Sequence, residues 1–259
     1  MNKSKALISK VLKAVNLYNS VRRAKIAIAK YSPKNIRYQK KILRFYSQLV
    51  RPGDLCFDIG ANVGDITHVL LKLGATVVAV EPQEVCLRSL YKRYRKNKRV
   101  TIVGKAVGEK EGYGELAVCE SANTISTLSD KWRNAGRFSR DYKWTKTQTV
   151  PITTLDSLIS LYGQPTFCKI DVEGFEPFVL KGLSKPIHFI SFEFTREFFD
   201  DAKECINYLL SIGEIKVNCS LRASWEFLFP WWVEPDELYN KLESTKDELL
   251  QGDIYIKFV

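Results

Sequence analysis

Residues 58–67, DIGANVGDIT, combine residue types that can hold a charged ligand, and they directly follow the apolar stretch LCF. Gly60 and Gly64 permit backbone dihedrals that a Cβ forbids and let the backbone approach a ligand closely. A glycine-rich turn after a strand usually faces a pyrophosphate, which an acidic residue ahead of the turn would repel. Asp58 instead suits a ligand that carries a cation, such as an ammonium group or a sulfonium.

A second acidic residue, Glu81, ends the next apolar run, TVVAVE (residues 76–81). An acidic side chain at this position of an α/β unit can accept both hydroxyls of a ribose. S-adenosylmethionine has both a ribose and a positively charged amino-acid tail. The alternative is that Asp58 caps the following helix and Glu81 is a surface acid. Because both acids flank one glycine-rich turn, the pattern favours the cofactor site.

From residue 55 onward, strand-like and helix-like segments alternate. Continuous apolar runs predict strands at residues 55–59, 76–81, 100–103, 166–171, 187–194, 214–219 and 253–258. Two further strand-like runs, residues 115–118 and 148–153, flank a long polar and aromatic segment. This alternation predicts an α/β fold whose parallel sheet is covered by helices on both faces. Ligands of such a sheet bind beyond the C-terminal ends of its strands, next to the first strand.

The run KIDVEGFE (residues 169–176) carries the residues best suited to catalysis. Strand alternation puts Lys169 and Asp171 on one face, and Asp171 ends a strand that we expect beside the first one. A hydroxyl acceptor is a poor nucleophile and needs a general base within hydrogen-bond reach. We expect Asp171 to be that base or to orient the acceptor, with Glu173 as the second candidate. Lys169 is expected to pair with a carboxylate, because a charge in an apolar strand needs a partner.

Other roles stay open for these carboxylates. The N-terminus of a helix favours acidic side chains, which accounts well for Glu176 and partly for Glu173. Glu193 ends a strand-like run and could also reach the acceptor, although a role at the strand end is an equal alternative. Asp171, Glu173 and Glu193 could together bind a divalent cation that holds acceptor hydroxyls. The sequence leaves a metal undecided.

These motifs resemble, in chain order, the FkbM-type S-adenosylmethionine-dependent methyltransferases. The matching segments lie within about residues 40–195 and are DIGANVGDIT, VVAVEP, KAVGEKEG, VPITTLDSL and CKIDVEGFEPFVLKG. The resemblance implies a Rossmann-like class I methyltransferase fold with a mostly parallel seven-stranded sheet. It implies methyl transfer to a hydroxyl of a carbohydrate, glycolipid or natural product. It places these residues at the cofactor: Asp58, Gly60, Asn62, Gly64, Thr67, Glu81, Pro82, Lys105, Ala106 and Asp171.

Two other functions are weaker alternatives. An RNA or N-directed methyltransferase is disfavoured by the acidic body of the chain and by the lack of an Asn-Pro-Pro-Tyr type motif. A binding module that keeps the nucleotide pocket without catalysis is disfavoured by the presence of Asp58, Glu81 and Asp171.

The net charge of +11 comes from the first part of the chain. Residues 1–53 contain 14 Lys and Arg and no Asp or Glu, which leaves 26 basic residues against 29 acidic ones in the remainder. A nucleic-acid enzyme usually carries basic residues around its active cleft, so nucleic acid is disfavoured as a partner. We expect residues 1–50 to form a basic helical arm and residues 51–259 to form the methyltransferase domain.

The arm has the pattern of an amphipathic helix. Residues 4–30 place Ile8, Val11, Leu12 and Val15 at helical spacing among basic side chains. Such a helix is typical of contact with an anionic membrane surface, and packing onto the domain is the alternative. No segment approaches the ~20 apolar residues of a membrane span, and six cysteines without metal-ligand spacing indicate a reducing cytoplasm. The expected location is cytoplasmic, at the inner face of the membrane if the arm binds lipid.

Residues 120–147 are expected to form an insertion on the acceptor side. They carry Trp132, Phe138, Tyr142 and Trp144 among six basic residues. Aromatic faces stack on sugar rings, and basic groups bind carboxylates or phosphates. The equal alternative is a surface insertion whose aromatic residues pack onto the domain.

Overall fold

The computed structural model describes residues 32–259, so the helix expected at residues 4–30 lies outside the described part of the chain. The chain divides into two compact units, residues 1–44 and residues 45–259. Helix α2 (Pro33–Tyr46) is the first described element. Its proline occupies the first helical position, where a missing N–H removes no helical hydrogen bond.

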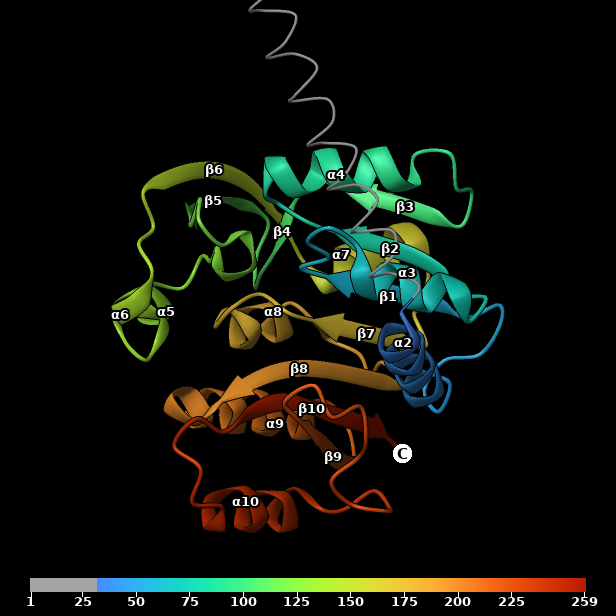
Figure 1. The fold of residues 1–259 in the computed structure, drawn as a ribbon, viewed down its shortest axis with the longest axis vertical. Helices are drawn as coiled ribbons and strands as arrows, with labels where there is room; N and C mark the ends of the chain where they lie inside the picture. The colour runs from blue at the N-terminus through green and yellow to red at the C-terminus, as the bar shows by residue number, and fades with distance from the viewer. Residues whose placement is uncertain (1–31) are drawn as a thin grey trace, which may run out of the picture. The chain divides into compact units, whose positions relative to one another are not determined.

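A seven-stranded sheet forms the centre of the second unit (Figure 1). Its strand order is β3-β2-β1-β7-β8-β10-β9. Neighbouring strands from β3 to β8 run parallel, and β10 runs antiparallel to both β8 and β9. The predicted α/β fold with a mostly parallel sheet is confirmed, and the last strand makes the sheet mixed. The strands are β1 (Leu55–Ile59), β2 (Thr76–Val80), β3 (Val100–Val103), β7 (Phe167–Ile170), β8 (Phe189–Thr195), β9 (Ile215–Leu221) and β10 (Gln251–Phe258).

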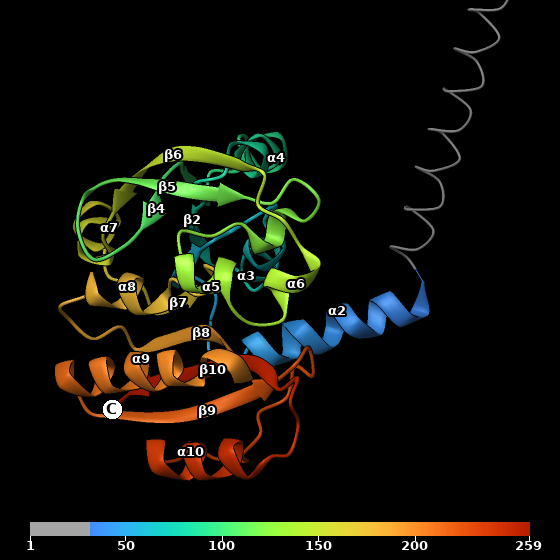
Figure 2. The ribbon, with the colours of Figure 1, turned by 90° about the vertical axis from the view of Figure 1, so that its left-hand side faces the viewer.

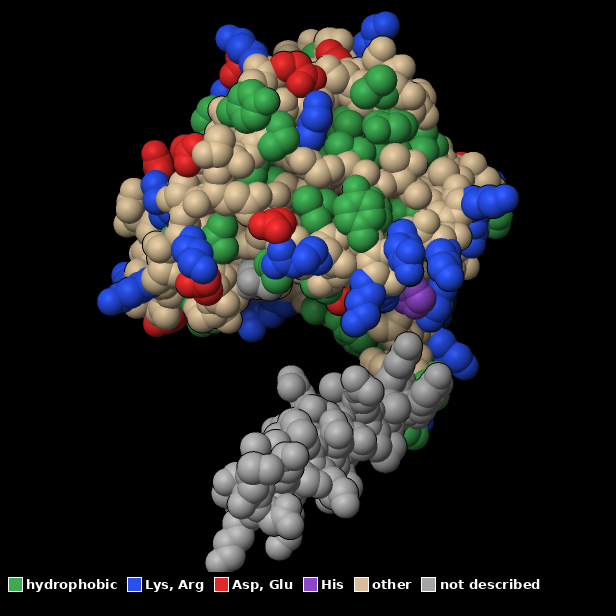
Figure 3. Space-filling view, turned by 90° about the horizontal axis from the view of Figure 1, so that it is seen from above, with side chains coloured by type: hydrophobic (Ala, Val, Ile, Leu, Met, Phe, Trp, Pro, Cys, Tyr) green, Lys and Arg blue, Asp and Glu red, His purple; other side chains and the backbone are tan. Residues whose placement is uncertain are grey.

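Helices cover both faces of this sheet, as Figures 1 and 2 show. Helices α3 and α4 lie on one face, α7, α8 and α9 lie on the other, and α10 packs beside β9. Figure 3 looks onto the side of the molecule that carries α4. The helices are α3 (Asp65–Lys72), α4 (Glu84–Tyr94), α7 (Leu155–Tyr162), α8 (Glu176–Lys181), α9 (Phe199–Ile212) and α10 (Pro235–Ser244).

Apolar periodicity explains why these segments pack as they do. In α4 the buried residues are Cys86, Leu90 and Tyr94, which recur every four positions and form one face. In β7 all four residues are buried, because the strand lies between two neighbours and under helices on both sides. The aliphatic and aromatic core therefore follows the central strands. Within residues 32–259, no helix is both long enough and apolar enough to cross a membrane.

A smaller three-stranded sheet stands at the edge where the parallel strands end, and Figure 2 looks onto this edge. Its order is β4-β6-β5, and the segment between β5 and β6 forms a short 3-10 turn and two short helices that the sequence did not predict. These helices have five and four residues, too few for a visible apolar period. The elements are β4 (Ala106–Val107), β5 (Gly112–Val118), η1 (Asn123–Ile125), α5 (Asp130–Asn134), α6 (Phe138–Asp141) and β6 (Lys146–Thr153).

Candidate active site

A cavity of about 250 Å³ opens at the C-terminal ends of the central strands. Its lining brings together Asp58 near the end of β1, Glu81 after β2 and Asp171 after β7. The insertion also contributes to the lining, through Ser126 and Thr127. We call this space the cofactor cavity. It lies where ligands bind in open α/β sheets, beyond the ends of the strands and next to the first one.

Asp58 is a buried carboxylate whose charge is only partly compensated. Its exposure is 2%, and its Oδ2 accepts a hydrogen bond from Thr67 Oγ1 at 2.5 Å. Burial raises the pKa of Asp58 to about 6, against the lowering effects of the Thr67 hydrogen bond and the Lys169 charge. Gly64 occupies the N-cap position of α3, and the backbone N–H of Thr67 in the first turn of α3 also lowers the pKa of Asp58 by hydrogen bonding, so Asp58 contacts the start of this helix as well as the cavity. A bound cation would relieve the cost of the buried charge.

Glu81 is likewise buried, with 6% exposure, which excludes the alternative of a surface acid. Its Oε2 accepts from the backbone N–H of Asn62 at 2.7 Å, and its Oε1 accepts from that of Gln83 at 2.8 Å. Burial raises the pKa of Glu81 to about 7, although both hydrogen bonds act to lower it. A carboxylate has about four lone-pair sites. Two of them therefore stay available for hydroxyl donors from a ligand.

The two glycines of the turn are required for different reasons. Gly60 has φ +79°, and a Cβ there would lie 1.8 Å from the carbonyl oxygen of Asp171. The end of β7 therefore approaches the turn too closely for any side chain. Gly64 has φ +83°, and a Cβ there would meet the side chains of Tyr94 and Leu90 at 2.6 and 2.8 Å. The absence of a side chain at Gly64 therefore lets the turn pack against α4.

The remaining residues expected at the cofactor divide into two groups. Asn62, Pro82, Lys105 and Ala106 all line the cofactor cavity. Gly64 and Thr67 are outside its lining, and Thr67 is fully buried. Thr67 acts on the site through its hydrogen bond to Asp58. Sequence spacing could not separate the two groups, because residues 58–63, 65 and 66 line the cavity while Gly64 and Thr67 within the same turn and helix do not.

Three carboxylates expected at the acceptor end lie together. One oxygen each from Asp171, Glu173 and Glu193 falls within 4.8 Å of the other two. Asp171 and Glu173 line the cofactor cavity, and Glu193 lines a smaller neighbouring one. Burial and the nearby carboxylates raise the pKa of Glu173 well above its ordinary value, and the same causes raise that of Glu193. We call these residues the carboxylate trio.

Lys169 holds one member of the trio in place. Its Nζ lies 3.2 Å from Asp171 Oδ2 and 3.0 Å from Asp253 Oδ1, and it donates to the carbonyl oxygen of Ile170 at 3.2 Å. Lys169 is 3% exposed. Burial alone would lower the pKa of Lys169, and the charges of Asp171 and Asp253 raise it well above its ordinary value. The expected structural role of Lys169 agrees with this geometry.

Asp253 is a site residue that the sequence analysis missed. It lies on β10, where the antiparallel register pairs it with Glu193 on β8. The available signal was a single acidic residue at the start of the run DIYIKF, in which Lys257 is the only other charged residue. Because 84 positions separate it from Lys169, only the strand order β7-β8-β10 brings the two side chains together.

Glu176 has a structural role. Its Oε1 accepts from the backbone N–H of Val172 at 3.0 Å, and its side chain is buried at the start of α8. Burial raises its pKa to about 7. It closes the turn between β7 and α8, as expected of an acidic residue at the N-terminus of a helix.

Comparison with known protein families shows which family the chain belongs to. Residues 58–216 match the family described as the methyltransferase FkbM domain. The chain belongs to the FkbM methyltransferase family. It is a methyltransferase that depends on S-adenosylmethionine, so the resemblance drawn from the motifs is confirmed. No curated protein matches the chain.

Solved structures similar to this methyltransferase are distant in sequence. Precorrin-6y C5,15-methyltransferase from Geobacter metallireducens GS-15 is 11% identical over 84% of this chain and 87% of that chain, with a TM-score of 0.46. A TehB-like methyltransferase from Corynebacterium glutamicum is 11% identical over 95% and 99%, with a TM-score of 0.45. Fibrillarin from Aeropyrum pernix, solved with natively bound S-adenosyl-L-methionine, is 12% identical over 80% and 68%, with a TM-score of 0.43.

The cofactor cavity of the methyltransferase has the chemistry that S-adenosylmethionine needs. Asp58 and Glu81 are buried carboxylates whose ionised forms a cation and a pair of ribose hydroxyls would stabilise. Apolar side chains, among them Val80, Ala106 and Leu116, line another part of the cavity and can hold a planar base. The residues present therefore fit the cofactor of the family.

The aromatic residues that the sequence singled out in the insertion are buried or half-buried. Trp132 is 4% exposed, stacks on Phe138 with ring centroids 5.1 Å apart and packs on Phe198 at 5.3 Å. The indole N–H of Trp144 donates to the carbonyl oxygen of Ile125 at 2.7 Å. Both tryptophans therefore stabilise the insertion, as the packing alternative predicts.

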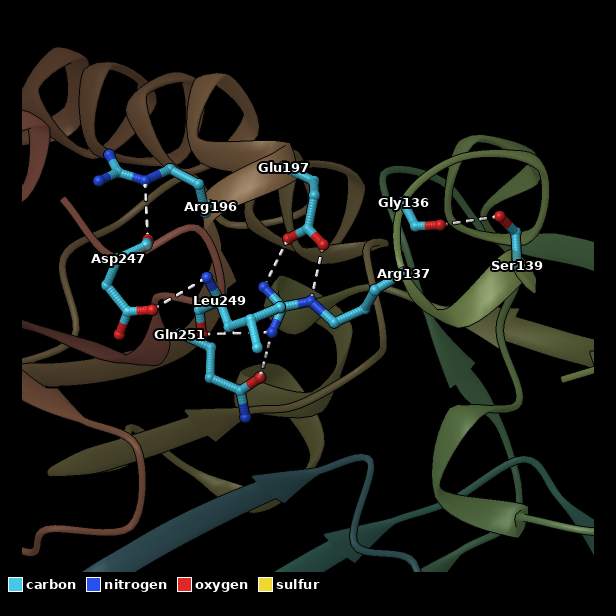
Figure 4. A network of polar contacts seen from close by, with 8 residues as sticks. All are labelled: Gly136, Arg137, Ser139, Arg196, Glu197, Asp247, Leu249 and Gln251. Carbon is cyan, nitrogen blue, oxygen red and sulfur yellow. Dashed lines mark hydrogen bonds and ion pairs between the residues drawn. The ribbon is translucent and has the colours of Figure 1, made fainter. Parts of the chain in front are cut away.

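Most basic residues of the insertion are held in ion pairs. Arg137 makes two hydrogen bonds to Glu197, at 2.6 and 2.7 Å, and donates to the carbonyl oxygen of Leu249 and the side chain of Gln251 (Figure 4). Three others also have acidic partners: Lys131 with Asp201, Arg133 with Asp130 and Lys146 with Glu120. Four of the six basic side chains thus bind the protein itself.

Proposed function

We propose that this methyltransferase methylates a hydroxyl of an uncharged, carbohydrate-like acceptor. The observation that carries the proposal is the carboxylate trio beside the cofactor cavity. Carboxylates accept hydrogen bonds from hydroxyls, and one of them can take the proton that a hydroxyl loses on methylation. The sugar or glycolipid class of acceptor expected from the sequence is consistent with such a site.

The charges around the trio favour an acceptor without anionic groups. The positive charge of Lys169 is already shared by Asp171 and Asp253. In the insertion, four of the six basic side chains are paired with acidic residues, including Arg137 with Glu197. A carboxylate or phosphate next to the reacting hydroxyl would therefore face the Asp171 carboxylate, with Lys169 already paired. Like charges at short distance in a partly buried site are strongly unfavourable.

Methyl transfer requires little covalent chemistry from the chain itself. When bound, S-adenosylmethionine supplies an activated methyl group with a good leaving group. We assign Asp171 the role of base: it accepts the hydrogen bond of the acceptor hydroxyl and takes its proton while the new O–C bond forms and the C–S bond breaks. Lys169 fixes the orientation of Asp171. The side chain of Asp171 is 41% exposed, so the proton can pass on to solvent.

Methyl-labelled S-adenosylmethionine tests this proposal. The purified protein is offered neutral alkyl hexosides, the matching uronic acids and RNA, and the labelled products are identified by mass spectrometry. We expect label on a hexoside hydroxyl, with uronic acids at least ~10-fold poorer because of the charges above. The Asp171→Asn variant is the control for label transferred without the base. Label in RNA or on an amine, or equal transfer to the uronic acids, would contradict the proposal.

A further inference from the structure

A strongly basic surface lies outside the active site. Residues 88–99, the last two turns of α4 and the loop after it, contain seven Lys and Arg and no Asp or Glu. All seven are exposed. We call this surface the basic face. Figure 3 shows Lys and Arg side chains gathered toward the right-hand side of the face that carries α4.

The charge of the basic face is concentrated rather than dispersed. From residue 54 to the end, the chain outside residues 88–99 holds 19 basic and 29 acidic residues. Within the basic face, Arg88 pairs with Glu84, and Arg93 lies 2.9 Å from Asp65. The other five cations form no ion pair with any residue that the structure describes, and one of them, Arg99, donates to the carbonyl oxygen of Ala75; the remaining four are Lys92, Arg95, Lys96 and Lys98. An otherwise acidic body thus presents one surface of uncompensated positive charge.

Apolar side chains accompany these cations. Tyr91 is 48% exposed and Val85 is 38% exposed, and both lie on the outer side of α4. An aromatic ring among Lys and Arg suits the boundary between lipid headgroups and acyl chains, because its body is apolar and its tip is polar.

The position of the basic face argues against a nucleic-acid substrate. Helix α4 starts at the edge where β2 ends, close to Glu81, and leads back to the start of β3. Residues 95–99 therefore lie at the edge of the sheet opposite the carboxylate trio. Enzymes that act on nucleic acid place their cations around the reaction cleft. A surface that only anchors the protein does not need to surround the reaction cleft.

We propose that the basic face docks the methyltransferase on an anionic lipid membrane. The charge complementarity of residues 88–99 and the exposed Tyr91 carry this inference, which does not depend on residues 1–31 or on the acceptor proposed above. Each basic side chain near an anionic bilayer adds on the order of fivefold to membrane partitioning. The edge of the sheet at the N-terminal ends of the parallel strands then faces the membrane. The carboxylate trio lies at the opposite edge, away from the membrane.

Vesicle co-sedimentation of the full chain tests the basic face. The test variant combines Lys92→Gln, Arg95→Gln and Lys96→Gln, since Gln has a similar helix propensity and removes the charge. The matched control combines Lys143→Gln, Lys241→Gln and Lys246→Gln, which removes three exposed charges elsewhere. Both variants retain residues 1–31, so that segment cannot account for a difference between them. Calorimetric binding of S-adenosylmethionine checks that each variant is folded.

We expect the wild type to bind vesicles that contain phosphatidylglycerol, to release them at high salt and to ignore vesicles of phosphatidylcholine alone. The test variant should lose at least ~10-fold in partitioning, and the control less than about threefold. Three outcomes would overturn the proposal: wild-type partitioning by the test variant, an equal loss in the control, or displacement of the wild type from vesicles by an RNA oligonucleotide. The last outcome would assign the basic face to nucleic acid.

Discussion

Replacement of Asp58 by Asn tests the cofactor site, because it removes the charge of this side chain and keeps its size. The carboxylate is buried, and burial raises its pKa from an ordinary value of 3.8 to about 6. An ionised carboxylate in that place is unfavourable until a cation arrives. The ammonium group or sulfonium of S-adenosylmethionine would supply one, so cofactor binding and the ionisation of Asp58 should be coupled.

The size of this coupling follows from the pKa shift. If the bound cation returns the pKa of Asp58 to its ordinary range, the coupling is about two pKa units, or roughly 2.7 kcal/mol. That corresponds to on the order of 100-fold in affinity. We therefore expect Asp58→Asn to weaken binding of S-adenosylmethionine at least ~10-fold near pH 7. Below about pH 6 the affinity of the wild type should fall about tenfold per pH unit more steeply than that of the variant, in which Glu81, with its pKa of about 7, still titrates in the cavity.

Without ligand, the effect of Asp58→Asn on the free energy of unfolding should be opposite in sign to its effect on cofactor affinity. The folded pKa of Asp58 lies above the unfolded one, so its contribution to stability is fully present below about pH 4 and is lost as the pH rises through about 6. Near pH 7, the unliganded Asn variant should therefore have a higher Tm than the wild type. Weaker binding together with a higher Tm cannot be explained by misfolding.

Calorimetry from about pH 5 to 8 and thermal unfolding without ligand measure these two effects. Thr67→Val removes the hydrogen bond that lowers the pKa of Asp58, so it should move the pH midpoint of binding upward. Asp130→Asn changes an exposed carboxylate outside the cavity and is the control. An affinity that does not depend on pH, or an Asn variant that binds as tightly as the wild type, would refute the reasoning.

Three further outcomes are expected. Asp171→Asn should lower turnover at least ~10²-fold and leave calorimetric binding of S-adenosylmethionine nearly unchanged. If this variant is fully active, Asp171 is not the base and a neighbouring glutamate is. Gly60→Ala should lower the free energy of unfolding by at least ~2 kcal/mol in denaturant titrations, because its Cβ would lie 1.8 Å from a carbonyl oxygen. Gly53→Ala has a similar positive φ and nothing within 4 Å, so it should cost only ~1 kcal/mol. A chelator should leave turnover unchanged, since the trio can share protons without a metal; loss of turnover that magnesium restores would instead assign the trio to a divalent cation.

Much of the cofactor site could be predicted from the sequence because its residues are close in the chain or end neighbouring strands. Asp58 and Gly60 lie within three positions of each other, and Glu81 ends the next strand. Parallel strands joined by helices end at the same edge of a sheet, so residues at or just beyond the ends of β1, β2 and β7 must meet there. The same rule brought Asp171 to the cavity.

What the sequence alone determined was therefore the fold class, the family and the cofactor, since each follows from local patterns repeated along the chain. Only the tertiary structure decided which side chains compensate one another. The pairing of Asp253 with Lys169 requires β10 to insert antiparallel beside β8. The partner of Arg137, Glu197, lies 60 positions away. Electrostatic energy depends on distance in space and on burial. Neither quantity can be obtained from the spacing of residues along the chain.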